Sequence, residues 1–266
     1  MKVSKADIKY FRSLSQKKIR QEERKFILEG WRALKEVLNS SSKVETVAVL
    51  ARYLEDPDYS SILSKLSERG ALVKELSEIE LKQVADTVHA QGVVAVVHQK
   101  QQSMETTDLN KASLIVAADA VSDPGNLGTI VRSSDWFAAD AILLGRGSVE
   151  LYNEKVVRST VGSIFHVPIV EGVDLPSELS QLKKQGFAIL SLSGDGNQVY
   201  TDVKSSGKVV FVFGSEARGI SPEVRNLSDA IVRIPKYGRA ESLNVGVACG
   251  IVLSQWRGER DKRKGD

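Results

Sequence analysis

Short apolar runs rich in β-branched residues alternate with segments of helical periodicity in the second half of the chain, and this alternation constrains the fold most. The strand-like runs occupy 114–118, 141–144, 188–193, 209–213 and 231–234. Helical spacing of apolar residues recurs near 127–138, 154–161, 177–185 and 243–256. Strands that alternate with helices form a largely parallel sheet covered on both faces, because each connection returns through a helix. The second half therefore predicts an α/β fold.

The first hundred residues predict a smaller α/β unit. Residues 44–50 and 93–97 have the composition of buried strands, and 60–70 that of a helix. Apolar residues recur at helical spacing over 26–39, which predicts another helix there. A polar stretch then separates the two halves. The predicted divisions are a first domain over 1–100, a linker over 101–111, a second domain over 112–257 and a basic tail over 258–266.

The net charge of +3 conceals an uneven distribution. Residues 1–32 hold ten Lys or Arg against four acids, and residues 257–266 hold five against three. The middle of the chain is therefore acidic. Basic ends on an acidic body favour contact with a polyanion such as nucleic acid, although a solvated helix face and a frayed tail give the same pattern.

Several classes of protein are disfavoured. No apolar run approaches the roughly 20 residues of a membrane span, and the N-terminal residues lack the apolar core of a signal peptide. The single cysteine excludes a disulfide framework, and His89, His98 and His166 lack the spacing of metal ligands. We expect a cytoplasmic protein without a metal.

The loops after the predicted strands narrow the choice of ligand. Residues 119–128, DAVSDPGNLG, lack the Gly-x-Gly-x-x-Gly fingerprint of a dinucleotide fold. Residues 214–221, GSEARGIS, place Ile220 where a phosphate-binding loop needs lysine, which argues against nucleotide hydrolysis. Three polar, glycine-containing turns remain, over 123–132, 213–221 and 234–250. Any one of them alone is compatible with a plain connection.

Together, the three turns resemble the motifs of the SpoU/TrmH-type RNA 2′-O-ribose methyltransferases of the SPOUT superfamily. The motifs are NLGTIVR (126–132), FGSEARGIS (213–221) and IPKYGRAESLNV (234–245), in this order along the chain. NEKVVRSTVGSIFHVPI (153–169) is similar to the intervening helix and strand of the family. KKIRQEERKFILEGWRALKEVL and DTVHAQGVVAVV resemble its N-terminal substrate-recognition domain.

The resemblance implies a function and an architecture. It implies methyl transfer from S-adenosyl-L-methionine to a ribose 2′-hydroxyl of structured RNA, with ribosomal RNA ahead of transfer RNA. The alternatives are a transfer RNA 2′-O-methyltransferase and an inactive RNA-binding or ribosome-assembly factor. It also implies an α/β RNA-recognition domain, a parallel-sheet SPOUT domain with a C-terminal trefoil knot, and a homodimer.

The motifs suggest roles for individual residues. Arg132 is nearest the chemistry by resemblance, and its guanidinium suits clamping of a phosphate and stabilisation of an alkoxide better than proton abstraction. Glu216 holds Arg132 or substrate, and Asn126 orients the turn or the ribose, unless it only caps a helix. The predicted catalytic set is Arg132, Asn126, Glu216, Ser242 and Asn244.

Further residues are assigned to the cofactor and to RNA. By resemblance, the cofactor lies in bent loops at Gly214, Ile234, Pro235, Gly238, Leu243 and Asn244. The predicted RNA contacts are Lys17, Lys18, Arg20, Arg24, Arg32 and Arg158. Two positions depart from the family pattern, since Lys236 replaces an apolar residue and Gly246 stands where serine is frequent. These departures bear on cofactor affinity.

Overall fold

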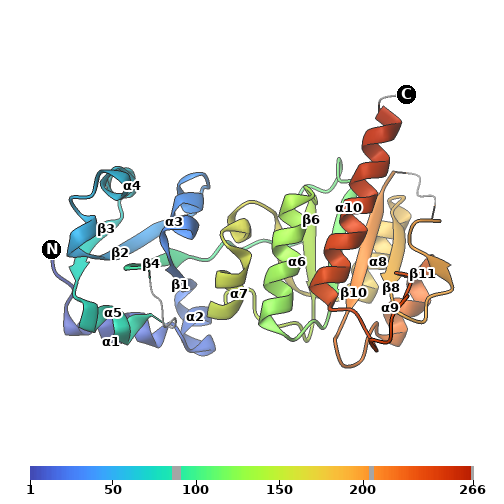
Figure 1. Ribbon diagram of the computed structural model, residues 1–266, viewed down its shortest axis with the longest axis horizontal. Coiled ribbons are helices and arrows are strands. Elements are labelled where there is room, and N and C mark those ends of the chain that lie inside the picture. The colour runs from blue at the N-terminus through green and yellow to red at the C-terminus, as the bar shows by residue number, and fades with distance from the viewer. Residues whose placement is uncertain (86–90, 204–206, 265–266) are drawn as a thin grey trace. The chain divides into compact units, whose positions relative to one another are not determined.

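A computed structural model describes residues 1–85, 91–203 and 207–264, with side chains to residue 260. His89 and the other four residues of the DTVHA segment (86–90) lie outside the described residues. The chain divides into two compact units (Figure 1). The first comprises Met1–Lys100 and Tyr152–His166, and the second comprises Gln101–Leu151 and Val167–Asp266.

A mixed four-stranded sheet in the order β1-β4-β2-β3 forms the first unit. β1 and β2 run antiparallel to β4, and β2 runs parallel to β3. The strands are β1 (Lys25–Glu29), β2 (Val44–Leu50), β3 (Leu72–Leu76) and β4 (Val93–His98). The helices are α1 (Lys5–Ser13), α2 (Lys17–Glu23), α3 (Trp31–Leu38), α4 (Pro57–Glu68), α5 (Glu78–Val84) and α7 (Glu154–Thr160).

The predicted helix over 26–39 is wrong in its first part. Residues 25–29 form β1, and the helix starts only at Trp31. Gly30 separates the two elements with φ +91°, a backbone conformation that few other residues adopt. The helical spacing of apolar residues extends across Gly30, so a strand and the following helix were predicted as one helix. Three consecutive buried side chains, as in β1, are compatible with either element.

The segment 152–166 packs within the first unit, whereas the sequence predicts it as part of the 112–257 domain. The Tyr152 and Phe165 rings lie 4.7 and 6.4 Å from the Phe26 ring. The Tyr152 hydroxyl also accepts a hydrogen bond from the Lys100 backbone N–H at 3.0 Å. The burial of these aromatic rings attaches α7 to β1, a contact that strand periodicity does not encode.

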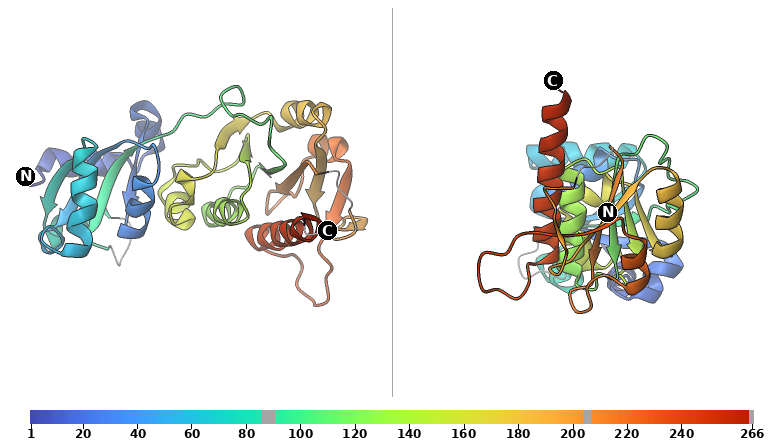
Figure 2. Two further views of the ribbon diagram at one scale, coloured as in Figure 1. Left: turned by 90° about the horizontal axis from the view of Figure 1, so that it is seen from above. Right: turned by 90° about the vertical axis from the view of Figure 1, so that its right-hand side faces the viewer.

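Seven parallel strands form the second unit in the order β7-β6-β5-β10-β8-β11-β9, as the sequence predicted for a parallel-sheet domain. They are β5 (Leu114–Asp119), β6 (Ala141–Gly145), β7 (Ile169–Val173), β8 (Ala188–Leu192), β9 (Gln198–Val199), β10 (Val209–Gly214) and β11 (Ala230–Arg233). α6 (Pro124–Trp136) and α10 (Val245–Lys264) pack together on one face of the sheet. α8 (Leu175–Lys184) and α9 (Pro222–Leu227) cover the other face (Figure 2).

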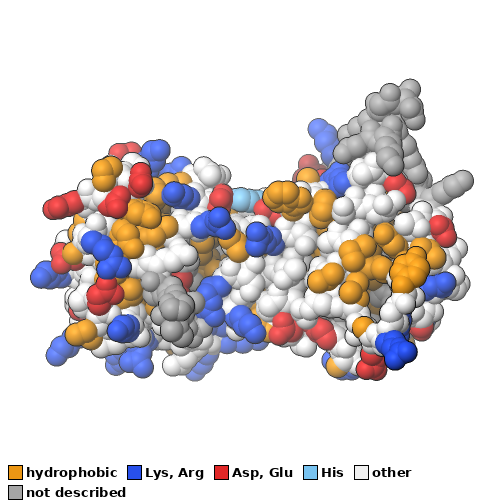
Figure 3. Space-filling model, viewed as in Figure 1, with side chains coloured by type: hydrophobic (Ala, Val, Ile, Leu, Met, Phe, Trp, Pro, Cys, Tyr) orange, Lys and Arg blue, Asp and Glu red, His pale blue; other side chains and the backbone are white. Residues whose placement is uncertain are grey.

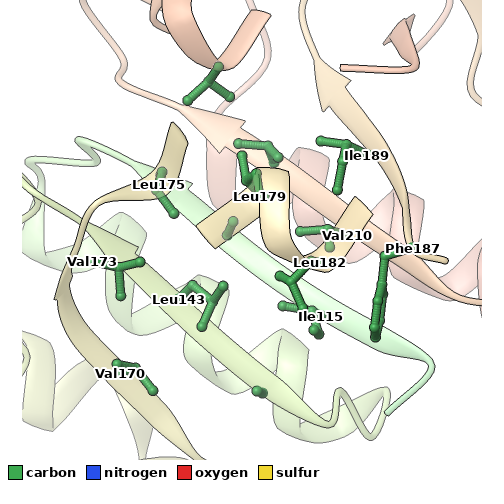
Figure 4. Close-up of a cluster of buried hydrophobic side chains, with 14 of the residues drawn as sticks. Ile115, Leu143, Val170, Val173, Leu175, Leu179, Leu182, Phe187, Ile189 and Val210 are labelled. Atoms are coloured by element: carbon green, nitrogen blue, oxygen red, sulfur yellow. The ribbon is translucent and has the colours of Figure 1, made fainter. Parts of the chain in front are cut away.

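The core of the second unit lies between α8 and the central strands. Every residue of β5 and β10 is buried, as expected for strands covered on both faces. Figure 4 shows the α8 leucines facing side chains of β5, β6 and β10. Full burial of each leucine contributes about 1.5–3 kcal/mol. The labelled contacts involve Leu175, Leu179, Leu182, Ile115, Leu143 and Val210.

After β11, residues 234–244 return to α10, which packs on α6 and β10. β8 lies between β11 and β10, so this segment passes the ends of intervening strands. The trefoil knot remains an expectation of the family resemblance. No helix among the described residues is long and apolar enough to cross a membrane. The same residues contain no cluster of three His, Cys, Asp or Glu side chains that could hold a metal ion.

Candidate active site

Three polar loops follow β5, β10 and β11 at one edge of the second unit's sheet. Carboxyl ends of parallel strands lie on the same edge, where ligands of open α/β sheets bind. The loop after β5 enters α6 through Asp123, whose carboxylate accepts the Asn126 backbone N–H at 2.8 Å. This helix cap satisfies an otherwise unpaired backbone donor and sets the position of the Asn126 side chain.

A chain of side-chain hydrogen bonds joins the three motifs. Asn126 Nδ2 donates to Glu216 Oε1 at 2.8 Å, and Asn244 Nδ2 donates to Asn126 Oδ1 at 2.7 Å. These residues lie 90 and 118 positions apart in the sequence. The structure therefore brings Asn126, Glu216 and Asn244 together, and we call them the motif triad.

Asn244 also caps α10. Its Oδ1 accepts the backbone N–H groups of Gly246 and Val247 at 2.9 and 3.2 Å. The amide oxygen thus faces the helix while the amide nitrogen faces Asn126. Capping and motif contact are not alternatives here, because one amide performs both. The start of α10 is consequently tied to the start of α6.

Glu216 is the last residue in the chain of hydrogen bonds, and its carboxylate acts only as an acceptor. Its Oε2 accepts the Ser122 backbone N–H at 3.3 Å. Partial burial opposes ionisation, but hydrogen bonds from Asn126 and from backbone N–H groups outweigh it and hold the pKa of the Glu216 carboxyl below its usual value. Glu216 is therefore an anion at neutral pH, and it fixes which end of the Asn126 amide points toward it.

The second motif folds back tightly on itself. A Cβ atom at Gly214 would lie 2.3 Å from the Gly219 carbonyl carbon, so only glycine fits. Ser215 and Gly219 exchange backbone hydrogen bonds at 3.0 and 2.8 Å. Asp119 Oδ2 accepts the Ser221 backbone N–H at 2.7 Å and anchors the loop to the end of β5. Sequence reasoning missed Asp119 and Ser122, although the position of Asp119 at a strand end was a usable signal.

The close packing of α10 against α6 explains why position 246 is glycine in this chain. It is buried against α6, and a Cβ atom there would lie 2.8 Å from both Cβ and Cγ2 of Thr129. Real Cβ atoms do not approach other heavy atoms so closely, so the serine frequent in the family would force α10 away from α6. The glycine at position 246, in place of serine, therefore follows from the short distance between the two helices.

Arg132 lies outside the motif triad. It is exposed on α6, and no described residue forms an ion pair with it. The predicted Arg132–Glu216 contact is absent from this structure, where Glu216 bonds Asn126 instead. Trp136 lies four residues further along α6 and is 81% exposed. The arginine thus stands beside an exposed apolar side chain on the same helical face.

The other predicted cofactor residues lie in the loop between β11 and α10, apart from Gly214. Ile234 and Pro235 are half-buried, whereas Gly238, Ser242 and Leu243 are exposed. Of the loop's predicted residues, only Asn244 joins the motif triad. Leu243 leaves half of its surface open beside Asn244, an apolar surface suited to a flat ring.

The predicted RNA contacts differ in accessibility. Lys17, Lys18, Arg24 and Arg32 are exposed. Arg20 is only 2% exposed and donates to the backbone carbonyls of Leu14 and Ser15. Its role in this structure is to hold the α1–α2 turn. Arg158 is partly buried, 3.8 Å from Glu29 within the first unit.

Family models match both parts of the chain. Residues 113–254 match the SpoU rRNA Methylase family, and residues 5–95 match the MRM3-like substrate binding domain. A Bacillus subtilis (strain 168) protein, named 23S rRNA (guanosine(2553)-2'-O)-methyltransferase RlmP, is 33% identical over 94% of this chain and 96% of its own length.

Solved structures agree with these matches. The AdoMet-bound rRNA methyltransferase from Sinorhizobium meliloti is 30% identical with a TM-score of 0.84, over 97% of this chain and 98% of that one. The A. aeolicus TrmH/SpoU tRNA modifying enzyme is 31% identical with a TM-score of 0.52, over 57% of this chain and 78% of that one. The rRNA enzyme is thus matched across both units, and the tRNA enzyme across little more than half of the chain.

Proposed function

The chain belongs to the SpoU rRNA methylase family, and we propose that it transfers a methyl group from S-adenosylmethionine to a ribose 2′-hydroxyl of ribosomal RNA. The motif triad carries this proposal. It links the three family motifs through oriented polar side chains at the edge of a parallel sheet, where ligands bind.

Large-subunit ribosomal RNA is the proposed substrate. The B. subtilis relative, named for guanosine 2553 of 23S rRNA, aligns with 94% of this chain, including the substrate-binding unit. The tRNA modifying enzyme, by contrast, aligns with only 57% of this chain. The corresponding guanosine is the first nucleotide to examine. A ribosomal substrate also supports the expected cytoplasmic location.

The loops fit the cofactor by the chemistry of their groups. Leu243 offers an exposed apolar surface for an adenine ring, and backbone groups at Gly214, Ile234 and Leu243 offer polar contacts. Pro235 and Gly238 shape the loop between them. S-adenosylmethionine, when bound, supplies a sulfonium methyl group that an oxygen nucleophile can displace.

The protein's contribution is orientation and charge stabilisation. Arg132 donates to the ribose 2′-oxygen as negative charge develops there and to the adjacent phosphate, because a guanidinium group has N–H donors and no acceptor. The hydroxyl proton passes to solvent water as the methyl group leaves the sulfonium sulfur for the oxygen. Glu216 acts through Asn126, whose amide it orients, and Asn244 holds the third motif in register. Ser242 contacts the target nucleotide from the same loop. In-line displacement requires this alignment of groups.

A homodimer completes the proposal. Trp136, 81% exposed, and Val247, 48% exposed, lie on the paired helices α6 and α10. The exposed indole at the end of α6 is a large apolar surface that a second copy can cover. Arg132 shares the α6 face with Trp136, so this dimer would also bring Arg132 close to the second copy.

Methyl transfer to defined RNAs tests the proposal. Purified protein and labelled S-adenosylmethionine are incubated with unmodified 23S rRNA transcript or with transfer RNA, and the products are mapped by mass spectrometry. We expect label at a ribose of 23S rRNA. Transfer to tRNA alone would support the tRNA alternative. RNA binding without transfer to either substrate would support an inactive assembly factor.

A further inference from the structure

The first helix carries a basic face that the predicted RNA contacts did not include. Lys5, Lys9 and Arg12 recur at i, i+4 and i+7 of α1, so they share one face. With Ile8, Ser13, Ser15 and Gln16, they line a cavity of about 500 Å³, here named the α1 groove. Figure 3 shows Lys and Arg side chains along the lower edge of the first unit, where Figure 1 places α1 and α2.

Nearby carboxylates are already engaged by other cations. Asp7, on α1 itself, pairs with Lys74 at 2.7 Å and caps the helix through Ser4. Glu22 lies 3.9 Å from Lys18, and Glu23 lies 3.6 Å from Lys25. By contrast, the side chains of Lys5, Lys9 and Arg12 have no ion pair with any residue in the described part of the chain. Their charge is available to a ligand.

The wall of the groove is held from inside. Buried Arg20 donates to the carbonyls of Leu14 and Ser15 at 2.9 and 2.6 Å, which fixes the turn that follows α1. Ile8 is buried at the floor. The surface is therefore already ordered in the free protein. A ligand that binds to it does not have to order the turn, so little conformational entropy is lost on binding. Arg20 stabilises this surface from below and does not contact the ligand.

We propose that the α1 groove binds backbone phosphates of the substrate RNA, an inference that rests on the proposed function. Three cations without a competing carboxylate complement a chain of phosphates, and the Ser13, Ser15 and Gln16 side chains add polar groups. Such contacts position an RNA without reading its bases. The groove thus anchors the RNA on the first unit.

Two triple variants with equal charge loss test the groove. K5Q/K9Q/R12Q neutralises the groove, and K35Q/K43Q/K65Q neutralises three exposed lysines of the same unit outside it. Binding of full-length protein to 23S rRNA transcript is measured by filter retention across a salt series. We expect the groove variant to bind about tenfold more weakly near physiological salt and the salt slope to fall by about 2–3. The control variant should stay within about twofold of wild type.

Kinetics give a second readout. Because phosphate contacts act equally on bound substrate and transition state, the groove variant should raise KM for RNA and leave kcat near wild type. The conservative variant K5R/K9R/R12K should retain binding. Thermal melting verifies that each variant is folded.

Equal RNA affinity and salt slope in the two neutralised variants would overturn the inference. Absence of methyl transfer by wild-type protein would instead overturn the proposed function, and the binding comparison would still report on the groove.

Discussion

Asn126 and Asn244, 118 residues apart, meet through one hydrogen bond of 2.7 Å from Nδ2 of Asn244 to Oδ1 of Asn126. The first amide belongs to the start of α6 and the second caps α10. Glu216 fixes the orientation of Asn126 from the other side. A single substitution at Asn126 therefore removes both hydrogen bonds that join the motif triad, and the consequences can be measured.

Asn126→Ala should lower kcat for methyl transfer about 100-fold, because misplacement of aligned groups by roughly 1 Å costs that much. It should also move the acidic limb of the pH–rate profile upward. The Asn126 amide helps to depress the pKa of Glu216, so its loss raises that pKa, and the ionised form is then lost at a higher pH as the solution is acidified.

Steady-state rates between pH 4 and 8 provide the measurement. Asn110→Ala, which removes an exposed amide outside the motifs, is the matched control. An unshifted acidic limb in Asn126→Ala would contradict the proposed orientation of Glu216.

Arg132→Ala should reduce kcat about 100- to 1,000-fold, as expected when a donor to a developing oxyanion is removed. Arg132→Lys should recover only a small part, because an ammonium group lacks the planar fork of guanidinium. Cofactor affinity, measured by calorimetry, should change little. Lys184→Ala removes an exposed charge on α8 as a control, and comparable losses in both alanine variants would argue against a specific role for Arg132.

Gly246→Ala should destabilise the protein by about 1–3 kcal/mol, since the new methyl group meets Thr129 at the α6–α10 contact. Gly258→Ala, in the same helix but facing open space, should stabilise it by about 0.5–1 kcal/mol. Urea unfolding of both variants measures the difference. A Gly246→Ala protein as stable as wild type, or more stable, would mean that α10 does not approach α6 as closely as described.

Trp136→Glu should convert a dimer into a monomer at micromolar concentrations, because a charge would be buried in the proposed interface. Sedimentation velocity gives the mass. Ile79→Glu is the control, since Ile79 is 72% exposed but lies on α5 of the first unit. A monomeric wild-type protein, or a dimer that survives Trp136→Glu, would refute this interface.

Cys249, the single cysteine, should react with a thiol reagent only after unfolding. It is fully buried in α10, and this burial raises the pKa of its thiol, so little thiolate forms at neutral pH. Ellman's reagent should label denatured protein fully and native protein very slowly. Rapid native labelling would show that α10 opens from the sheet.

Local patterns in the sequence predicted much of this molecule. The alternation of strands and helices predicted a parallel sheet, because burial on both faces requires continuous apolar runs. The motifs around Asn126, Glu216 and Asn244 are recognisable in the sequence alone. Gly30 separates β1 from α3, but the helical spacing of apolar residues continues across it. For this reason β1 was wrongly predicted as helix.

Tertiary structure decided which of these residues meet and what each one does. Strand order places the ends of β5 and β10 side by side, and the return of the chain to α10 brings Asn244 to Asn126. Packing around Tyr152 attached α7 to the first unit, and burial turned Arg20 from a predicted RNA contact into a support for the α1–α2 turn. The sequence by itself determined the parallel-sheet elements of the second unit and the chemistry of the three motifs, because periodicity and side-chain type are local properties. Only the folded chain determined the partners, because contacts between residues far apart depend on how the elements pack.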